Sequence, residues 1–252
     1  MTQPVFDFCE RVVVVTGGSR GVGAGIVAAF VATGAHVVAC GRHEAEVEGA
    51  VFMTADVRKP PDAERVVAKA VEHFGRLDVL INNAGGSPHV LAADATPRFV
   101  EAIVNLNLLA PLWCAQSAHK VMAVQEDGGS IVNITSVSGM RPSPGASAYG
   151  AAKAGLINLS QTLAMEWAPL VRVNCVTAGL LDTGAGDDFY GGPEGMARAA
   201  ATVPLGRMGN PADVAEACLF LSSEAASYVT GANLVVHGGG EPPPFLGAVA
   251  QS

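Results

Sequence analysis

The sequence is poor in charged residues, and the balance of those it has is acidic. Only 15 % of its 252 residues are charged and the net charge is −8, whereas a protein that binds a phosphate backbone needs a basic face. No apolar run reaches the roughly 18 residues that a membrane span requires. The N-terminus, MTQPVFDFCER, is acidic where a signal peptide would be basic and apolar. We therefore expect no nucleic-acid or membrane partner and a cytoplasmic location.

Cysteine pairs and metal-ligand clusters are also missing. The five cysteines are odd in number and scattered, with no CxxC pair, which favours reduced and mostly buried thiols (Cys9, Cys40, Cys114, Cys175, Cys218). The His and Cys residues show no metal-ligand spacing, so no metal is expected. Hydrophobic residues, in contrast, make up 50 % of the chain, which is ample for a core.

Apolar strand patterns alternate with helical patterns along the chain. Strands are expected at 12–16, 36–40, 50–54, 77–82, 130–135, 171–176 and 233–237, and helices at 22–33, 61–74, 96–125 (broken or bent near Pro111), 147–167 and 211–221. Continuous apolar runs such as VVVV suit strands that are covered on both faces. The alternation predicts right-handed βαβ units and one doubly wound α/β domain with a parallel sheet of about seven strands. No linker divides the chain, so we expect a single domain over 1–252.

Two segments fall outside this alternation. GAGDDFYGGPEGM (184–196) lies between a strand and a helix, and we predict a loop there that acts as a substrate lid over 184–200. The tail EPPPFLGAVAQS predicts an irregular C-terminal arm at 240–252.

The turn TGGSRGVGAG (16–25) directly follows the first predicted strand and opens the first helix. Its glycines permit positive φ angles, and they let backbone N–H groups approach a pyrophosphate at the positive helix N-terminus. The turn lacks the GK[ST] ending of a phosphate-binding NTPase loop. It therefore predicts a dinucleotide cofactor held by Gly17, Ser19, Arg20, Gly21, Val22 and Gly23.

Ligands in such folds bind at the carboxyl ends of the strands, where three further segments fall. Asp56 and Val57 follow the third strand, and the Asp56 carboxylate is a candidate acceptor for an adenine amino group. Asn83, Ala84 and Gly85 follow the fourth strand, where small residues would let the backbone reach a ribose or ring. A turn or helix-cap role for Asp56, and an ordinary strand-ending turn at 83–85, are open alternatives. TAGLLDT (177–183) follows the sixth strand.

In SAYGAAKAG (147–155), Tyr149 and Lys153 lie four residues apart among Ser, Ala and Gly. A helix that rises about 1.5 Å per residue would put their side chains about 6 Å apart on one face. Such a pair is either a surface accident or a proton-donating pair.

Taken together, these motifs resemble the short-chain dehydrogenases/reductases. TGGSRGVG, NNAG, a serine thirteen residues before the tyrosine, and YGAAK occur in the family's order and spacing, and the likeness covers about residues 10–240. The resemblance implies a Rossmann-like fold and an NAD(P)-dependent oxidoreductase that interconverts a ketone or aldehyde and an alcohol. A non-catalytic cofactor-binding sensor and an enoyl reductase of the same fold are the alternatives. The substrate and the physiological direction stay open.

The resemblance also implies a catalytic set at Asn107, Ser136, Tyr149 and Lys153. Tyr149 would be the general acid or base. Lys153, together with the positive nicotinamide of the oxidised cofactor, would lower the pKa of the phenol, and Lys153 would also bind the ribose. Ser136 would hold the substrate oxygen, and Asn107 would anchor a water. The rivals are Asn105 for the asparagine, and Thr135 and Ser138 for the serine.

The sequence departs from the family pattern after the sixth strand. Ala178-Gly179 replaces the usual Pro-Gly, which loosens the turn before the nicotinamide. The resemblance nevertheless implies cofactor contacts from Gly179, Leu181 and Thr183. His237 stands where the family often has an acid, which we interpret as a structural change.

The end of the second strand bears on the choice between the two cofactors. Proteins that prefer NAD usually place an acid there to accept from the ribose 2′-OH, whereas this chain has Gly41 followed by Arg42, with Arg20 in the phosphate turn. Two guanidiniums and no carboxylate favour a 2′-phosphate, unless both are solvated surface charges. NADP(H) is therefore expected to be preferred over NAD(H).

The segments 96–125 and 147–167 carry more apolar residues than one sheet-facing stripe needs. The family resemblance implies a homotetramer, or else a homodimer, through these helices.

Overall fold

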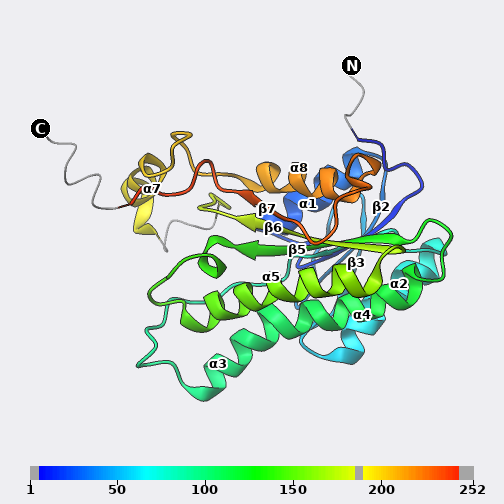
Figure 1. The fold of residues 1–252 in the computed structure, drawn as a ribbon, viewed down its shortest axis with the longest axis horizontal. Helices are drawn as coiled ribbons and strands as arrows, with labels where there is room; N and C mark the ends of the chain where they lie inside the picture. Colours follow the sequence, from blue (N-terminus) through cyan, green and yellow to red (C-terminus); the bar gives the residue numbers. More distant parts are fainter. Residues whose placement is uncertain (1–5, 185–189, 244–252) are drawn as a thin grey trace, which may run out of the picture.

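The computed structural model describes residues 6–184 and 190–243. Its seven strands form one parallel sheet in the order β3-β2-β1-β4-β5-β6-β7, with helices on both sides (Figure 1). The strands are β1 (Val12–Thr16), β2 (His36–Gly41), β3 (Ala50–Thr54), β4 (Val79–Asn82), β5 (Gly129–Ser136), β6 (Val171–Ala178) and β7 (Asn233–Val236). The chain therefore has the predicted Rossmann-like, doubly wound fold.

The helices form two layers. One layer contains α1 (Gly21–Ala32) and α8 (Pro211–Ser222), which contact each other. The opposite layer contains α2 (Pro60–Phe74), α4 (Ala110–Met122) and α5 (Ser147–Trp167). The shorter elements are α3 (Pro97–Val104), η1 (Asn105–Leu109), η2 (Val137–Gly139), α7 (Gly192–Ala201) and η3 (Glu224–Ala226).

The run of valines in β1 shows why this strand is central. Val12 and Val14 belong to the core under α2, α4 and α5, whereas Val13 and Val15 belong to the core under α1 and α8. Successive side chains of a strand point to opposite faces, so a strand between two helical layers needs apolar residues at every position. All four valines are at most 1 % exposed.

The predicted break in the long helix near Pro111 is confirmed and is a π-helical turn, η1. Proline has no N–H, and its ring conflicts with the carbonyl four residues earlier, here that of Asn107. The Asn107 side chain folds back and donates from Nδ2 to the Ile103 carbonyl at 2.9 Å.

The stretch Pro97–Met122 is, among the described residues, the one helix long and apolar enough by composition to cross a membrane. In this fold α4 packs against α2 and β4, and η1 packs against α5.

The predicted lid and arm are described only in part. Residues 185–189 lie outside the described residues. The loop expected over 184–196 is wrong from residue 192 onward, because helix α7 begins at Gly192, and the role of 184–200 as a lid stays a prediction. Pro193 in the first turn and the alanine-rich run that follows both favour a helix. In the arm, residues 240–243 have no helix or strand, and residues 244–252 lie outside the described part.

Cys9 is exposed and the other four cysteines are buried, and all five are free thiols.

Candidate active site

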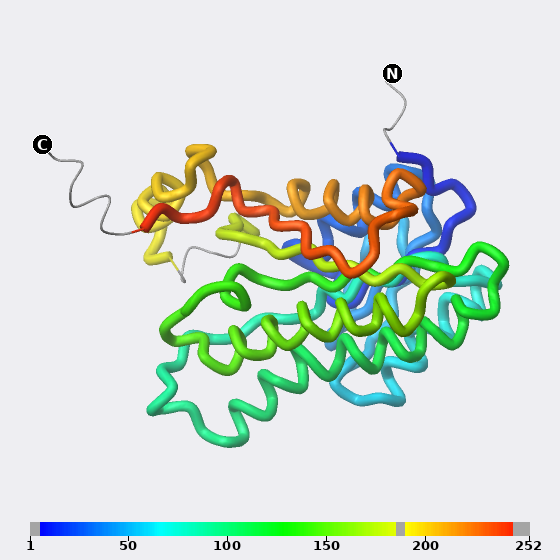
Figure 2. Tube along the Cα trace, viewed as in Figure 1, coloured from blue at the N-terminus to red at the C-terminus, as the bar shows by residue number. Residues whose placement is uncertain are grey.

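The site residues come together because parallel strands end at the same edge of the sheet. In the strand register Asn82 lies beside Asn133, and Ser136 lies beside Ala178. Figure 2 shows the segments that follow β5, β6 and β7 gathering near α7 at one end of the molecule. The loops that the sequence selected therefore meet at this edge.

The glycine turn after β1 leaves the first turn of α1 open. Gly17 and Gly21 have φ angles of 66° and 53°, and a Cβ at Gly23 would lie 2.0 Å from the Gly17 carbonyl oxygen. The cap residue Arg20 makes no side-chain cap bond, and the first turn contains no acidic residue. Backbone N–H groups at a helix N-terminus attract anions, so this turn fits a pyrophosphate.

The segment after β4 is fixed to the glycine turn by Thr16. Its Oγ1 accepts from the backbone N–H groups of Asn83 and Ala84, each at 3.0 Å. The Asn83 side chain donates to the carbonyls of Thr16 and Gly17 at 2.9 and 3.1 Å. Asn83 therefore builds the site by joining two turns. Thr16 was not predicted as a site residue, although it is the first residue of the TGGSRGVG motif.

Gly85 packs directly against two predicted catalytic residues. A Cβ at this position would lie 2.8 Å from Asn107 Oδ1 and 3.2 Å from Lys153 Nζ. The absence of a side chain at Gly85 therefore lets these two side chains, and a ligand beside them, approach the backbone closely. The residues present therefore fit the dinucleotide that the glycine turn predicts.

Tyr149 and Lys153 lie on one face of α5, as their spacing predicts. Lys153 Nζ lies over the Tyr149 ring, 5.7 Å from its centroid, and donates to the Ile134 carbonyl at 2.8 Å. Lys153 is only 3 % exposed, and burial lowers its pKa from 10.5 to about 8. Because an ammonium has three N–H groups, this bond leaves donors for a ligand.

The pKa of Tyr149 is raised rather than lowered in the protein without cofactor. Burial is the main cause, and the side-chain hydrogen bond with Ser136 opposes it. Lys153 is not among the causes of this shift, so the expectation that it lowers the pKa of the phenol together with the oxidised nicotinamide stays a prediction. A lower phenol pKa would need a further positive charge near the ring.

The hydrogen bonds distinguish Ser136 from its two rivals. Thr135 points toward β6, where its Oγ1 bonds to Thr177 Oγ1 and to the Val176 carbonyl. Ser138 Oγ accepts from Ser143 Oγ at 3.1 Å. Ser136 is the member of the three whose side chain meets Tyr149.

Asn107 is likewise favoured over Asn105. It is fully buried, its Oδ1 accepts from the Gly86 N–H at 2.9 Å, and its Nδ2 donates to the Gly86 carbonyl at 3.0 Å. Asn107 therefore holds the segment after β4 next to Lys153. The Asn105 Oδ1 atom is buried and has no hydrogen-bond partner among the described residues.

The predicted adenine contact, Asp56, is engaged by an arginine that the sequence analysis missed. Arg58 donates from Nε and Nη2 to the two carboxylate oxygens of Asp56, at 2.8 and 2.6 Å. This bond lowers the pKa of Asp56, and the charge of Arg42 lowers it further. Arg42 and Arg20 are both exposed, and Val57 is buried. The end of β2 thus brings Arg42 toward Asp56 and Arg58.

The segment after β6 reaches both the cofactor turn and β7. A Cβ at Gly21 would lie 3.7 Å from the Thr183 Cβ, and Leu181 forms a bridge with Gly209. Gly179 donates to the Val236 carbonyl at 2.9 Å, and a Cβ on it would lie 2.6 Å from the Cβ of His237. The Ala178-Gly179 departure therefore keeps the glycine that this contact requires.

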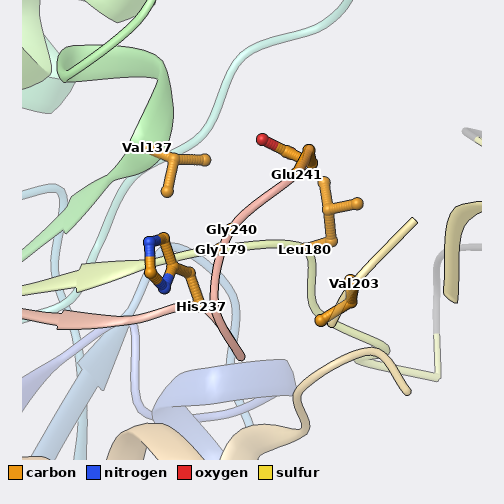
Figure 3. A pocket seen from close by; sticks show the side chains of 7 residues that line it. All are labelled: Val137, Gly179, Leu180, Val203, His237, Gly240 and Glu241. Atoms are coloured by element: carbon orange, nitrogen blue, oxygen red, sulfur yellow. The ribbon is translucent and has the colours of Figure 1, made fainter. Parts of the chain in front are cut away.

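A hollow too narrow for a water molecule lies at the ends of β5, β6 and β7, beside Val137, the residue that follows Ser136 (Figure 3). Its lining consists of apolar side chains, glycines and two polar side chains, namely Val137, Gly179, Leu180, Val203, His237, Gly240 and Glu241. His237 and Glu241 were not predicted as site residues. Their position directly after β7 was the signal available in the sequence.

Comparison with known proteins agrees with this architecture. The family model described as "Enoyl-(Acyl carrier protein) reductase" matches residues 17–241. L-fucose dehydrogenase from Bos taurus is 36 % identical over 247 residues, which cover 93 % of this chain and 90 % of that protein. A probable 2,4-dienoyl-CoA reductase from Bacillus subtilis is 34 % identical over 253 residues, covering 94 % and 99 %.

The fold has a close match among solved structures. A short-chain dehydrogenase/reductase from Brucella melitensis, titled glucose/ribitol dehydrogenase, superposes with a TM-score of 0.86 at 30 % identity and covers 93 % of this chain and 98 % of its own. A family model that matches nearly the whole chain, relatives above 30 % identity and the shared fold agree with one another. The chain belongs to the short-chain dehydrogenase/reductase family of NAD(P)-dependent oxidoreductases.

Proposed function

We propose that this protein interconverts a carbonyl compound and its alcohol with NADP(H) as the preferred cofactor and Tyr149 as general acid or base. The observation that carries the proposal is the pairing of Tyr149 with Lys153 on one face of α5, with Ser136 close enough to oppose the rise in the pKa of the phenol. The nicotinamide, when bound, supplies or accepts the hydride.

The chain itself handles the proton. In the reductive direction the Tyr149 hydroxyl donates its proton to the substrate oxygen, on which negative charge develops, and Ser136 Oγ donates a hydrogen bond to the same oxygen. The raised pKa of Tyr149 keeps the phenol protonated at neutral pH, which suits this role. In the oxidative direction the phenolate is needed, and positive charge at Lys153 favours it.

Lys153 and Asn107 prepare the proton path. With a pKa of about 8, Lys153 is mostly an ammonium at pH 7 and retains N–H groups for the cofactor ribose. Asn107 holds Gly86 by two hydrogen bonds and packs against Gly85. A water on Asn107 would connect Lys153 with solvent.

The variant Tyr149→Phe tests the proton role. It removes the transferable proton while it keeps the ring, so kcat should fall by at least about 10²-fold, with little change in cofactor Kd. Tyr228→Phe is the matched control because Tyr228 is fully exposed, and it should behave like wild type. Near wild-type kcat in Tyr149→Phe would remove Tyr149 from the mechanism.

Enoyl reduction is the second candidate, because the matching family model carries that description and one relative is named a probable 2,4-dienoyl-CoA reductase. Enoyl thioesters and simple ketones, offered separately with each cofactor, distinguish the two reactions. A wild-type protein that binds cofactor but transfers hydride to no carbonyl, enoyl or alcohol substrate would favour the non-catalytic sensor instead.

The proposed NADP(H) preference rests on charge near the end of β2. Arg42 and Arg58 both act on Asp56, so guanidinium groups gather where a 2′-phosphate would lie. The double variant Gly41→Asp/Arg42→Ala should reverse the preference, since each charged hydrogen bond lost costs about 1.5–3 kcal/mol. A Cβ at Gly41 would lie 3.3 Å from Ser19 Oγ, so an aspartate fits with a small adjustment.

The ratio of kcat/KM for NADPH to that for NADH is the measurement. Arg98→Ala is the control because Arg98 is an exposed arginine on α3, and it should leave the ratio unchanged. A wild-type ratio that favours NADH would overturn the cofactor preference and leave the hydride transfer intact. The homotetramer and the cytoplasmic location also stay proposals.

A further inference from the structure

A line of buried polar side chains crosses the sheet under α5. Asn82 at the end of β4 lies beside Asn133 on β5, and Asn133 lies beside Cys175 on β6. All three residues are at most 2 % exposed. Two residues earlier on β5 and β6, Ile131 and Val173 belong to the apolar core of the same layer. Polar groups in such a layer lower stability unless they are hydrogen-bonded, so this line needs a reason.

Three of these side chains form a chain of hydrogen bonds that ends on α5. Asn82 Nδ2 donates to Asn133 Oδ1 at 2.8 Å, and Asn133 Nδ2 donates to Ser160 Oγ at 2.8 Å. Ser160 Oγ in turn donates to the Leu156 carbonyl at 2.7 Å. Because the hydroxyl proton is used within the helix, the lone pairs of Ser160 Oγ are free to accept from Asn133. Asn82, Asn133 and Ser160 are called the polar row below.

The polar row begins in the segment that reaches the glycine turn. Asn82 Nδ2 also donates to the Pro111 carbonyl on α4, at 3.1 Å. The next residue, Asn83, donates to the glycine turn, and Gly86 exchanges two hydrogen bonds with Asn107. Segment 82–86 is therefore fixed at both ends by the stretch that contains η1 and α4. The polar row connects this segment to α5.

Ser160 and Lys153 lie on the same face of α5. They are seven residues apart, which is about two helical turns, and both are at most 3 % exposed. Their partners are consecutive residues of β5, because Lys153 Nζ donates to the Ile134 carbonyl at 2.8 Å and Ser160 Oγ accepts from Asn133. Two hydrogen bonds therefore hold this face of the helix on one strand.

The other neighbours of Lys153 carry no charge at neutral pH. Burial raises the pKa of Cys175 to about 11, and Ser160 and Lys153 both lie close enough to oppose this rise. Burial also raises the pKa of Tyr149, whose ring lies 5.7 Å from Lys153 Nζ. In the described part of the chain, no carboxylate acts on the pKa of Lys153. The place of its ammonium therefore depends on how α5 sits on β5.

We propose that Asn133 and Ser160 are positioning residues that hold α5 on β5, so that Lys153 keeps its place beside Tyr149 and the cofactor. The inference rests on the role of Lys153 in the function proposed above, and both residues act through Lys153. Without the Ser160 hydroxyl, Asn133 Nδ2 would be a buried donor with no acceptor, and the helix would shift to admit water to it. A displacement of about 1 Å far from the chemistry can lower a rate by about 10²-fold.

Ser160→Ala tests the proposal in steady-state kinetics with cofactor and the fastest simple ketone or enoyl thioester. We expect kcat to fall at least about 10-fold with KM little changed, and Ser160→Thr, which keeps a hydroxyl, to restore kcat. Thr162→Ala is the matched control, because Thr162 is exposed on α5 and its hydroxyl bonds only to the Asn158 carbonyl of its own helix. Wild-type kcat in Ser160→Ala, or an equal loss in Ser160→Thr, would overturn the role of the hydroxyl.

A double-mutant cycle with Asn133→Ala tests the connection between the two residues. If they act through their shared hydrogen bond, Asn133→Ala/Ser160→Ala should have the same kcat as Asn133→Ala alone. Losses that multiply would overturn the connection. Lower Tm in all the variants with unchanged kcat would show that the polar row only stabilises the fold, and would overturn the proposal.

Unfolding without cofactor measures the place of Lys153 independently of catalysis. Each protein is compared with its own Lys153→Met counterpart, so that the titration of Cys175, Tyr149 and the other groups cancels. With Ser160 present, the difference should change with pH between about 8 and 10.5. In Ser160→Ala water reaches Lys153, so its pKa should rise and the change should begin closer to pH 10.5.

The two measurements separate this inference from the proposed function. An unchanged pH dependence in Ser160→Ala would overturn the positioning of Lys153 even if kcat falls. The expected shift in a wild-type protein that transfers no hydride would overturn the proposed function and leave the hold of Asn133 and Ser160 on Lys153 intact. Thr162→Ala should leave the pH dependence as it is in the wild-type protein.

Discussion

Lys153 is a buried cation, and its burial predicts that removing its charge will stabilise the protein without cofactor. The side chain is 3 % exposed, and its pKa falls from 10.5 to about 8. A shift of this size is about 3 kcal/mol of unfavourable free energy for the ammonium in the folded state. Lys153→Met, which has a similar length and no charge, should relieve this penalty.

The expected gain is smaller than the penalty, because the variant also loses the hydrogen bond to the Ile134 carbonyl. Such a bond contributes about 1 kcal/mol, which leaves a net stabilisation of about 2 kcal/mol. For a chain of this size, the corresponding rise in Tm is about 4–8 °C at pH 7. The same variant should lose activity, because the ammonium of Lys153 lowers the stability of the fold but is needed at the proposed site.

The stability difference between Lys153→Met and the wild-type protein should depend on pH. Below pH 8 Lys153 is protonated in both the folded and the unfolded state, so the wild-type protein carries the full penalty. Between pH 8 and 10.5 the folded protein loses the proton first and the unfolded chain holds more protons, so wild-type stability rises with pH. The advantage of Lys153→Met should therefore be greatest below pH 8 and disappear as the pH approaches 10.5.

The assay is thermal unfolding of both proteins without cofactor from pH 6 to 10.5. Lys120→Met is the matched control, because the Lys120 side chain is 71 % exposed. This variant should change Tm little at any pH. A Lys153→Met protein that is less stable than wild type at pH 7 would refute the reasoning. A stability difference that stays constant through pH 10 would refute it equally.

Three further predictions concern the cofactor space, the sheet and the assembly. Gly85→Ala should raise cofactor Kd at least about 10-fold by fluorescence titration, because its Cβ would lie 2.8 Å from Asn107 Oδ1; unchanged Kd would contradict the placement of the cofactor there. Asp78→Asn should lower the unfolding free energy by about 1.5–3 kcal/mol, since its carboxylate binds Arg11, Arg76 and the β1 backbone; a denaturant midpoint equal to wild type would contradict this. Light scattering at micromolar concentration should give a tetramer or dimer mass, and a monomer mass would exclude the proposed assembly.

The elements that local sequence patterns control were the ones predicted well. The α5 helix begins and ends where its pattern predicted, and the sheet has the expected parallel strands. The residues that were missed owe their positions to individual side-chain contacts, one within a turn and one between distant segments. Arg58 meets Asp56 through a turn, and Glu241 meets Arg141 although 100 residues separate them. Neither pairing leaves a periodic pattern in the sequence.

The loop expected over 184–196 was wrong from residue 192 onward for a different reason. Pro193 occupies the first turn of α7, where proline is well tolerated. The alanine-rich stretch after it has high helix propensity. The position of the segment between a strand and a helix did not show that the helix begins at Gly192.

The small residues around Tyr149 and Lys153 have a physical cause that the motif alone did not show. A Cβ at Gly150 would lie 2.7 Å from the Ser138 carbonyl oxygen, and a Cβ at Gly139 would lie 2.7 Å from the Ala154 backbone nitrogen. The η2 turn and α5 therefore approach each other backbone to backbone. Because Ser136 immediately precedes η2, this close approach is what brings its hydroxyl to the phenol. The glycines on both sides thus set the distance between Tyr149, the proposed acid, and Ser136, the proposed holder of the substrate oxygen, and larger residues at these positions would separate the two side chains.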